Sequence, residues 1–362
     1  MPMKRVFLTG AYNLAGSHIL DQLLSFNVSV RAVVGSRDEA QALEQQYTPK
    51  SNTLLDFAII PPKDRSAPGA YDEALDGYPG PFDTVIHTVA ANPSEGADCL
   101  TRFIHLETET LLNFLRSVNY IAKNVRRVII TTSLTPFARW LVDPQVERSP
   151  RGGNPTSQRA PEIDTEYVLA TSRASDNIIH DEIWKWAKDT HARFDLVSLT
   201  APSIYGPSIR PLTNSTDLEE ANRRIWNICS NDSTETVTSP PYGIDYFTDV
   251  RDFAFAHVQA VLIPEASNKR FTVSAGMMPR GPVIAEFLRN RFPEFGSRIQ
   301  PDTSPPRRTP AEEQPLELVD TTPAATILGL VRYRPIEETL TDLARQILEL
   351  HRRKEWRSVI QS

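Results

Sequence analysis

A glycine-rich turn near the amino terminus is the first feature of the sequence that could do chemistry. The segment Thr9–Gly16 (TGAYNLAG) follows an apolar run and precedes a helical pattern. At such a strand-to-helix turn, the first amides of the helix can bind the pyrophosphate of a dinucleotide. Gly10 would allow the tight turn and Gly16 the close packing of helix on sheet, whereas Asn13 stands where a glycine is usual and is expected to tolerate a positive φ. A tight turn that binds no ligand is the alternative.

Two arginines lie in the segment that holds the second apolar run, VRAVVGSRDEA. A carboxylate at the tip of this strand would bind the adenosine ribose hydroxyls of NAD, but Gly35 and Ser36 stand there. Arg31 and Arg37 could pair with a 2′-phosphate, so the segment favours NADP over NAD, which is still possible. The alternative is that both arginines are solvated surface residues.

The elements that must position these residues follow from the alternation of apolar runs and helical patterns in the first 200 residues. This alternation predicts βαβ units around a parallel sheet with both faces covered, an α/β fold. Strands are expected at Arg5–Thr9, Val28–Val34, Leu54–Ile60, Thr84–His87, Arg127–Thr131 and Asp195–Leu199. Helices are expected at Ser17–Phe26, Leu100–Asn119, Arg173–Lys188, Leu218–Cys229 and Ile336–Arg353. A polar stretch at Asp143–Pro161 predicts a surface loop.

Composition narrows the class of protein. The chain has 362 residues, with 39 lysines and arginines against 45 aspartates and glutamates, a net charge of −6 that gives no electrostatic reason to bind nucleic acid or an anionic membrane. The two cysteines, Cys99 and Cys229, predict neither a disulfide framework nor a zinc site, and no metal is expected. The amino terminus leads directly into a strand and no apolar run approaches the roughly 20 residues of a bilayer span. We therefore expect a cytoplasmic globular protein.

Several motifs occur in a fixed order along nearly the whole chain. They are FLTGAYNLAGSHILDQLL, VIHTVAA, VIITTSL, SLTAPSIYGPSI, FTDVRDFAFAHVQAVLIPEASNKRFTVSAG and LGLVRYRPIEETLTDLARQIL. Together they resemble the extended short-chain dehydrogenase/reductases, nearest the dihydroflavonol reductase, cinnamoyl-CoA reductase and fungal aldehyde or methylglyoxal reductase group. The resemblance implies a Rossmann-type doubly wound sheet formed by residues 1–200, with a return at about 243–275. A smaller C-terminal substrate-binding lobe would comprise residues 201–242 and 276–362.

The family's chemistry is hydride transfer between a nicotinamide and a carbonyl, carried out with a Ser, a Tyr and a Lys. By resemblance Ser133 takes the serine position, where its hydroxyl would orient the carbonyl, although it could instead satisfy a strand end. In the segment EYVLATSR the alignment puts Leu169 at the tyrosine position and Arg173 at the lysine position. Tyr167 lies two positions early, about 200° around the helix, and is the best substitute acid. Arg173 could hold the nicotinamide ribose.

The resemblance also implies the cofactor and its contacts. NADP is expected, and NAD is possible. Three departures from the family pattern are expected to weaken cofactor binding: Asn13 replaces the central glycine, Gly35 the usual phosphate-binding arginine, and Pro62 an acid that would contact the adenine. The residues expected to contact the cofactor, besides Arg31 and Arg37, are Gly10, Asn13, Leu14, Gly16, Thr88, Arg173, Pro202 and Ser203.

Three functions compete at this point. The first is an NAD(P)-dependent carbonyl reductase with an atypical proton donor, acting on a small organic aldehyde or ketone such as a natural product. The second is a non-redox enzyme on the same scaffold, a dehydratase, isomerase or cyclase, which the missing phenol and amine would suit. The third is a non-catalytic binding protein, because a fold alone does not establish activity. In each case we expect a small-molecule ligand and a monomer or homodimer.

Overall fold

The computed structural model describes residues 4–48, 51–89, 100–134, 165–230, 246–296, 298–299 and 319–361. Within its helices, the side chains of residues 51–52, 100–103, 165–173, 175 and 354–361 are outside the description. The expected loop at Asp143–Pro161 and the residue Cys99 also lie outside the described residues.

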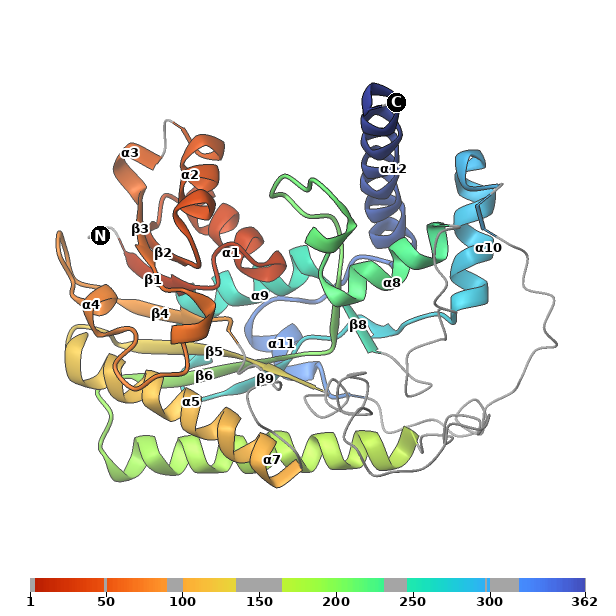
Figure 1. Ribbon diagram of the computed structural model, residues 1–362. Helices are drawn as coiled ribbons and strands as arrows, with labels where there is room; N and C mark the ends of the chain where they lie inside the picture. Colours follow the sequence, from red (N-terminus) through yellow and green to blue (C-terminus); the bar gives the residue numbers. More distant parts are fainter. Residues whose placement is uncertain are drawn as a thin grey trace, which may run out of the picture.

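A seven-stranded parallel sheet forms the centre of the protein, with strand order β3-β2-β1-β4-β5-β6-β9 (Figure 1). Six of its strands confirm the expected ones to within two residues, because strands buried on both faces read as continuous apolar runs. The chain order reverses between β1 and β4, which is where a doubly wound sheet opens a crevice for ligands. The strands are β1 (Arg5–Thr9), β2 (Ser29–Val34), β3 (Leu55–Ile59), β4 (Thr84–His87), β5 (Arg127–Ser133), β6 (Asp195–Ala201) and β9 (Arg270–Thr272).

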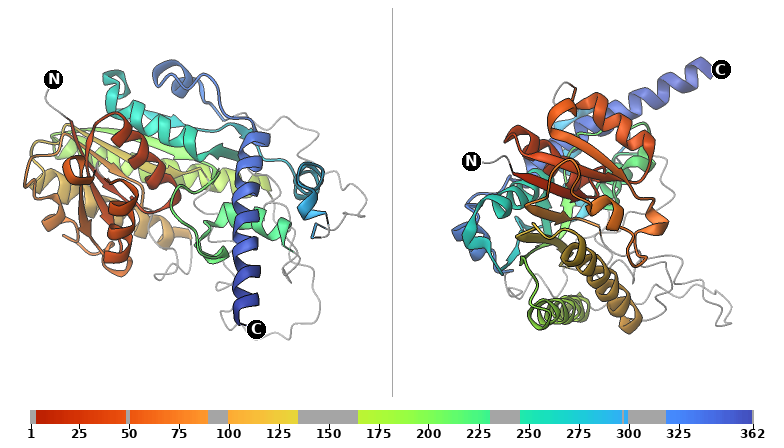
Figure 2. Two further views of the ribbon diagram at one scale, coloured as in Figure 1. Left: turned by 90° about the horizontal axis from the view of Figure 1, so that it is seen from above. Right: turned by 90° about the vertical axis from the view of Figure 1, so that its left-hand side faces the viewer.

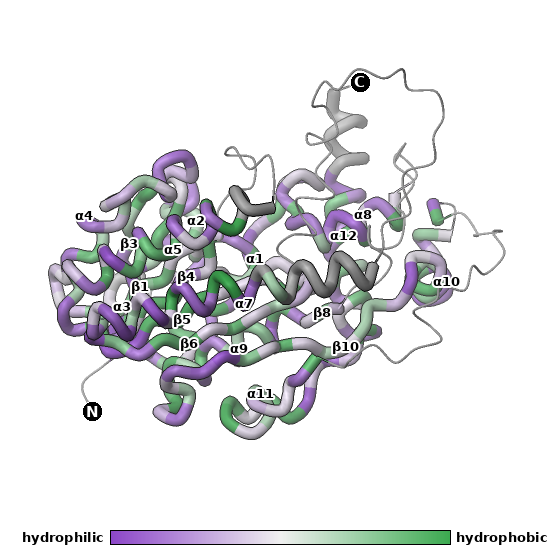
Figure 3. Tube along the Cα trace, turned by 90° about the horizontal axis from the view of Figure 1, so that it is seen from below, coloured by the Kyte–Doolittle hydropathy of each residue, from purple (hydrophilic) through white to green (hydrophobic). Residues whose placement is uncertain are grey.

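Helices cover both faces of this sheet. One face packs against α1 (Leu14–Ser25), α2 (Arg37–Gln46), α9 (Val250–Leu262) and α11 (Thr322–Ile327), with α3 (Ser51–Leu54) at the start of β3. The other face packs against α4 (Asp72–Leu75), α5 (Leu100–Ile121) and α7 (Thr165–Asp189). Figure 3 shows hydrophobic stretches in green among the strands and in α11. The Rossmann-type architecture expected from the motifs is therefore confirmed.

A second, three-stranded sheet lies beyond β6, with the order β10-β8-β7. Its elements and helices are β7 (Ser203–Tyr205), α8 (Glu220–Cys229), β8 (Tyr246–Asp249), β10 (Gly276–Met277), α10 (Gly281–Arg291) and α12 (Ile336–Gln361). They share a separate hydrophobic cluster that includes Ile225, Leu288 and Leu343. Figures 1 and 2 show α10 and α12 at the opposite end of the molecule from α2 and α3. Within the stretch 276–362, expected to belong to the lobe, Ala324 and Leu328 pack instead in the cluster on the main sheet.

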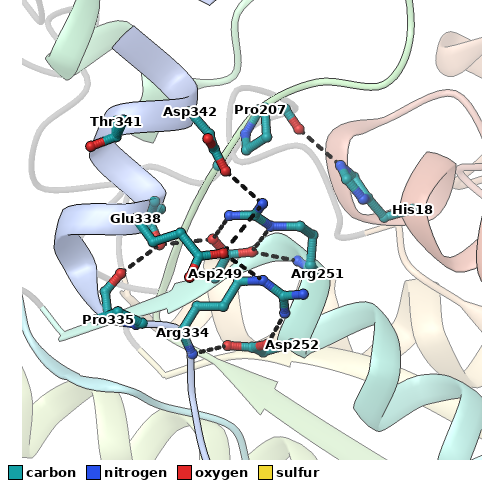
Figure 4. A network of polar contacts seen from close by, with 12 residues as sticks. His18, Pro207, Asp249, Arg251, Asp252, Arg334, Pro335, Glu338, Thr341 and Asp342 are labelled. Atoms are coloured by element: carbon teal, nitrogen blue, oxygen red, sulfur yellow. Dashed lines mark hydrogen bonds and ion pairs between the residues drawn. The ribbon is translucent and has the colours of Figure 1, made fainter. Parts of the chain in front are cut away.

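A partly buried ion-pair network joins α9 to α12 (Figure 4). Asp249 caps α9 by accepting from the Arg251 amide (2.8 Å), and its other oxygen accepts from Arg251 Nη2 (2.8 Å) and Thr339 Oγ1 (2.7 Å). Arg251 Nη1 also lies 2.7 Å from Asp342 Oδ2. Burial alone would raise the pKa of Asp249, but the hydrogen bonds from Arg251 and Thr339 outweigh it and hold the pKa below its usual value. The network therefore fixes the C-terminal helix to the Rossmann sheet.

A histidine on α1 makes a second link across the molecule (Figure 4). His18 Nε2 lies 2.8 Å from the carbonyl oxygen of Pro207, which follows β7. Burial lowers the pKa of His18 and so favours the neutral form of the ring at this contact. The segment that leaves β7 is thus held against the helix that opens with the glycine-rich turn.

Candidate active site

The two glycines of the turn are required by its geometry. Gly10 has a φ of +67°, in the left-handed region that favours glycine. A Cβ at Gly16 would lie 2.0 Å from the carbonyl oxygen of Gly10, a distance that no side chain could tolerate. Helix α1 therefore begins in close contact with the end of β1, and its first amides stand at the crevice between β1 and β4. This close backbone approach fits a dinucleotide pyrophosphate.

Asn13 has a different role from the one expected. Its φ of −78° and ψ of 172° are extended backbone, so the expectation of a positive φ at this position is wrong. Asn13 is the N-cap of α1: its Oδ1 accepts from the Gly16 amide at 2.6 Å, and its Nδ2 donates to Thr88 Oγ1 at 3.2 Å. Asparagine is among the preferred N-cap residues because its side chain satisfies an unpaired helix amide. The side chain therefore links the turn to the end of β4.

The ends of β1 and β4 are joined by buried hydrogen bonds. Thr88 donates its hydroxyl to the Thr9 carbonyl (2.7 Å) and its amide to Thr9 Oγ1 (3.1 Å), and Thr9 Oγ1 also lies 3.0 Å from His87 Nδ1. His87 stacks on Phe114 of α5 with ring centres 4.0 Å apart. Burial lowers the pKa of His87 to about 3, so this ring is neutral. Thr88 and His87 are thus buried and bonded to Thr9 where β1 and β4 end.

Arg31 does not reach the crevice, so its expected pairing with a 2′-phosphate is wrong. Its guanidinium forms an ion pair with Asp56 on β3 and donates to the carbonyls of Ala74 (3.0 Å) and Asp76 (2.9 Å). The residue lies in the middle of β2, three positions before the strand ends. Arg37, in contrast, is the exposed first residue of α2, directly beyond the carboxyl end of β2.

A second arginine at this end of β2 was missed in the sequence. Arg65 follows the short helical turn Pro62–Asp64 after β3, and a Cβ at Gly35 would lie 3.1 Å from one of its terminal nitrogens. The space that a side chain at position 35 would use is therefore taken by a guanidinium from another loop. The nearest carboxylate, that of Glu39, accepts from the Gly35 amide at 2.7 Å. No signal in the sequence pairs residues 35 and 65.

Ser133 is the last residue of β5 and lies at the same edge of the sheet as the glycine-rich turn. It is half-buried and pairs in register with Ala201, the last residue of β6. Pro202 and Ser203 follow directly, where the chain passes from the main sheet into β7. The carboxyl ends of β1, β5 and β6 thus carry, along one edge of the sheet, the start of α1, the Ser133 hydroxyl and the turn at Pro202.

Hydrogen bonds beneath Ser133 hold the end of β5 on both faces. Thr131 Oγ1 lies 2.8 Å from Nε2 of His257 on α9, and Thr132 Oγ1 lies 2.8 Å from Thr200 Oγ1 on β6. Burial lowers the pKa of His257 to about 4, so it is a neutral partner inside the core. The strand end that carries Ser133 is therefore fixed by side chains as well as by the ladder.

The remaining candidate catalytic residues lie on α7. This helix spans Thr165–Asp189, so positions 167, 169 and 173 belong to one continuous helix. Positions 169 and 173 are four residues apart, and position 167 lies about 200° from position 169. The side chains of Tyr167, Leu169 and Arg173 are outside the described residues, so their roles remain predictions.

The described residues show neither a membrane helix nor a metal centre. Within the ranges that the structure describes, no helix has both the length and the apolar character needed to cross a bilayer. Over the same ranges, no three His, Cys, Asp or Glu side chains come together as metal ligands, and the thiol of Cys229 is buried and free.

The parallel sheet, the switch point and the glycine-rich turn define a Rossmann-type α/β protein with a second sheet beside it. No family model matches the sequence. A protein of Aspergillus niger named ketoreductase azaE is 28% identical over 305 residues, which cover 83% of this chain and 86% of that protein. A protein of Candida albicans named putative NADPH-dependent methylglyoxal reductase GRP2 is 22% identical over 296 residues, covering 81% and 84%.

A solved structure shares the fold over almost the whole length. The crystal structure of yeast methylglyoxal/isovaleraldehyde reductase Gre2 complexed with NADPH has a TM-score of 0.69 and 20% identity, and the match covers 96% of this chain and 99% of that one. The resemblance to the extended short-chain dehydrogenase/reductases, on the side of the fungal ketoreductases and methylglyoxal reductases, is confirmed by these relatives.

Proposed function

We infer that the chain is an NADPH-dependent carbonyl reductase that acts on a small organic aldehyde or ketone. The observation that carries this proposal is the close-packed glycine-rich turn at the switch point, on the same sheet edge as Ser133. The names of the relatives, a ketoreductase and an NADPH-dependent methylglyoxal reductase, support the reaction class and the cofactor. They do not favour the non-redox alternative or the binding protein.

The described residues suit the parts of the cofactor as follows. The pyrophosphate would lie on the first amides of α1, including that of Leu14, where Gly10 and Gly16 allow the turn and the helix to pack closely. Arg37 and Arg65 flank the end of β2 and would bind the 2′-phosphate, since a guanidinium matches a phosphate in charge and geometry. Thr88, Pro202 and Ser203 would border the crevice toward the nicotinamide.

The chain's own residues would then prepare the carbonyl. NADPH, when bound, supplies the hydride. Ser133 would donate its hydroxyl to the carbonyl oxygen and stabilise the negative charge that develops there. Arg173 would hold the nicotinamide ribose with a permanent positive charge. The proton would come from Tyr167, or, where that phenol does not reach, from Thr171 or water. We expect the enzyme to work in the cytoplasm as a monomer or homodimer.

Purified protein, NADPH and a panel of aldehydes and ketones test this proposal. We expect oxidation of NADPH in a one-to-one ratio with alcohol formed, and Ser133→Ala should lower kcat at least tenfold while NADPH affinity changes less than twofold. Ser25→Ala, at the exposed end of α1, is the matched control and should retain full activity. A product at the redox level of its substrate would refute the reductase, and failure to bind NADPH would refute the cofactor.

A further inference from the structure

A carboxylate from the far side of the crevice contacts the start of α1. Glu219 immediately precedes α8, and its Oε1 accepts from the backbone amide of Leu14 at 3.3 Å. The two residues are 205 positions apart in the sequence. The first amides of a helix attract anions because they are unpaired and lie at the positive end of the helix dipole. Glu219 therefore uses an amide that the proposed function assigns to the pyrophosphate.

An arginine stands beside this contact. Arg210 Nη2 lies 3.8 Å from Glu219 Oε1, and its guanidinium carbon lies 5.2 Å from the centre of the Tyr12 ring, within the glycine-rich turn. Nη2 also donates to the Asp217 carbonyl at 2.6 Å. The Arg210 side chain is 14% exposed, whereas that of Glu219 is 41% exposed. The cation is thus mostly buried at the turn, and the anion can turn toward solvent.

The guanidinium of Arg210 retains unused donor capacity. Its Nε is buried and has no hydrogen-bond partner in the part of the chain that the structure describes. Buried donors are nearly always paired, so an unpaired one beside an anion site indicates a missing acceptor. Asp217 does not supply this acceptor: its Oδ2 accepts from the Thr213 amide (2.8 Å), the Thr213 hydroxyl (2.7 Å) and the Asn214 amide (3.1 Å), and neither of its oxygens bonds to Arg210 Nε.

The segment that carries both residues is anchored at its start. His18 of α1 contacts the carbonyl of Pro207, three residues before Arg210. At its other end, α8 packs into the hydrophobic cluster of the second sheet through Ile225 and Trp226. The segment therefore crosses from the turn to the lobe with Arg210 and Glu219 held at the pyrophosphate end of the crevice.

From this arrangement we propose that Arg210 and Glu219 act as a displaceable ion pair at the pyrophosphate position. Glu219 competes with the pyrophosphate for the Leu14 amide, and Arg210 pairs with whichever anion holds that amide. Dinucleotide binding would turn Glu219 into solvent and give Arg210 a second, doubly charged partner. The inference rests on the proposed function, because the competing ligand is the pyrophosphate of the nicotinamide dinucleotide.

The two residues should have opposite effects on affinity. Glu219→Gln removes the competing charge and should tighten NADPH binding up to about fivefold, the range of a partly exposed ion pair. Arg210→Met removes a charge-assisted partner of the pyrophosphate and should weaken NADPH binding by about tenfold or more. Arg210→Lys keeps the charge without the planar fork and should fall between. A loss of folding would weaken NADPH binding in both variants, so it cannot explain changes in affinity of opposite sign.

Matched controls lie within a few residues. Glu220→Gln removes the next carboxylate, which pairs with Arg224 at 2.9 Å, and should leave the Kd within twofold. Arg223→Met removes a guanidinium that donates to the carbonyls of Thr216 and Leu218, and it should also leave the Kd within twofold. Melting curves of every variant report folding independently of the ligand.

The experiment is a fluorescence titration with NADPH, with adenosine 2′-monophosphate as a second probe measured by competition. That probe lacks the pyrophosphate, so neither Glu219→Gln nor Arg210→Met should change its affinity more than twofold. If folded Glu219→Gln and Arg210→Met both bind NADPH as the wild type does, the displaceable pair is refuted and the reductase proposal stands. If the wild type does not bind NADPH, both proposals are refuted. Equal effects on the two probes would overturn the assignment to the pyrophosphate.

Discussion

Replacing Gly16 by alanine tests the packing of the turn on which the cofactor site depends. A Cβ at this position would lie 2.0 Å from the Gly10 carbonyl oxygen and 2.7 Å from the Gly10 carbonyl carbon. Side-chain carbons essentially never approach other heavy atoms closer than 3.0 Å, so α1 and the end of β1 must separate by about 1 Å. Overpacking a tight site costs about 1–3 kcal/mol, and both partners here are backbone, which cannot rotate away. We therefore expect Gly16→Ala to lose about 3 kcal/mol of unfolding free energy.

Urea unfolding and NADPH titration measure the two consequences separately. The same displacement moves the Leu14 amide, so NADPH affinity should fall by about tenfold or more even where the variant is folded. Gly80→Ala is the control, because no heavy atom lies within 4 Å of its added Cβ, and its unfolding free energy should change by less than about 0.5 kcal/mol. A Gly16→Ala protein with the urea midpoint and NADPH affinity of Gly80→Ala would refute the close approach of turn and helix.

Three further predictions concern acid stability, cofactor choice and the proton donor. Burial lowers the pKa of His87 to about 3, so below pH 6.5 the unfolded chain binds a proton that the folded chain does not. This residue should therefore lower the unfolding free energy by up to about 1.4 kcal/mol for each pH unit of acidification. Urea titrations at pH 7 and pH 5 should show a smaller loss of unfolding free energy in His87→Gln than in the wild type. Arg65→Met should raise the Kd for NADPH about tenfold and leave the Kd for NADH unchanged, because only NADPH carries the 2′-phosphate. Fluorescence titrations compare this variant with Arg193→Met, an exposed residue two positions before β6, and equal losses of affinity for both cofactors would contradict the assignment. Tyr167→Phe should lower kcat at least tenfold with NADPH affinity unchanged, and an undiminished steady-state kcat would assign the proton to Thr171 or water.

The sheet could be predicted from the sequence because its strands are buried on both faces. Val6, Phe7 and Leu8 of β1 are all fully buried, so the strand reads as a continuous apolar run. The requirement for glycine at positions 10 and 16 was equally visible, since the turn precedes α1 directly. What the local pattern could not supply was the conformation of Asn13, because an N-cap asparagine and a left-handed one share the same sequence.

The arginines differ because tertiary contacts decide which of them reaches the crevice. Arg31 is surrounded by acceptors from β3, from α4 and from the residue after α4, none of which adjoins it in the sequence. Arg65 reaches Gly35 because two parallel strands end side by side, with Val34 paired to Ile59. Both contacts depend on the pairing of β2 with β3, which cannot be predicted from the sequence of either strand alone.

The position of a residue relative to the end of its strand nevertheless carries the missing information. Ligands of doubly wound sheets bind beyond the carboxyl ends of the strands. Arg37 lies beyond the end of β2, whereas Arg31 lies three residues before that end, so the two side chains cannot both contact a ligand bound there. The strand was expected to end at Val34, and that boundary already excluded Arg31. The position of Glu219 could not be predicted in this way, because it lies outside the strands of the main sheet, on a segment that reaches the same edge from the second sheet. Residues within the parallel strands can therefore be sorted by strand position alone, whereas those that cross from the lobe require the path of the chain.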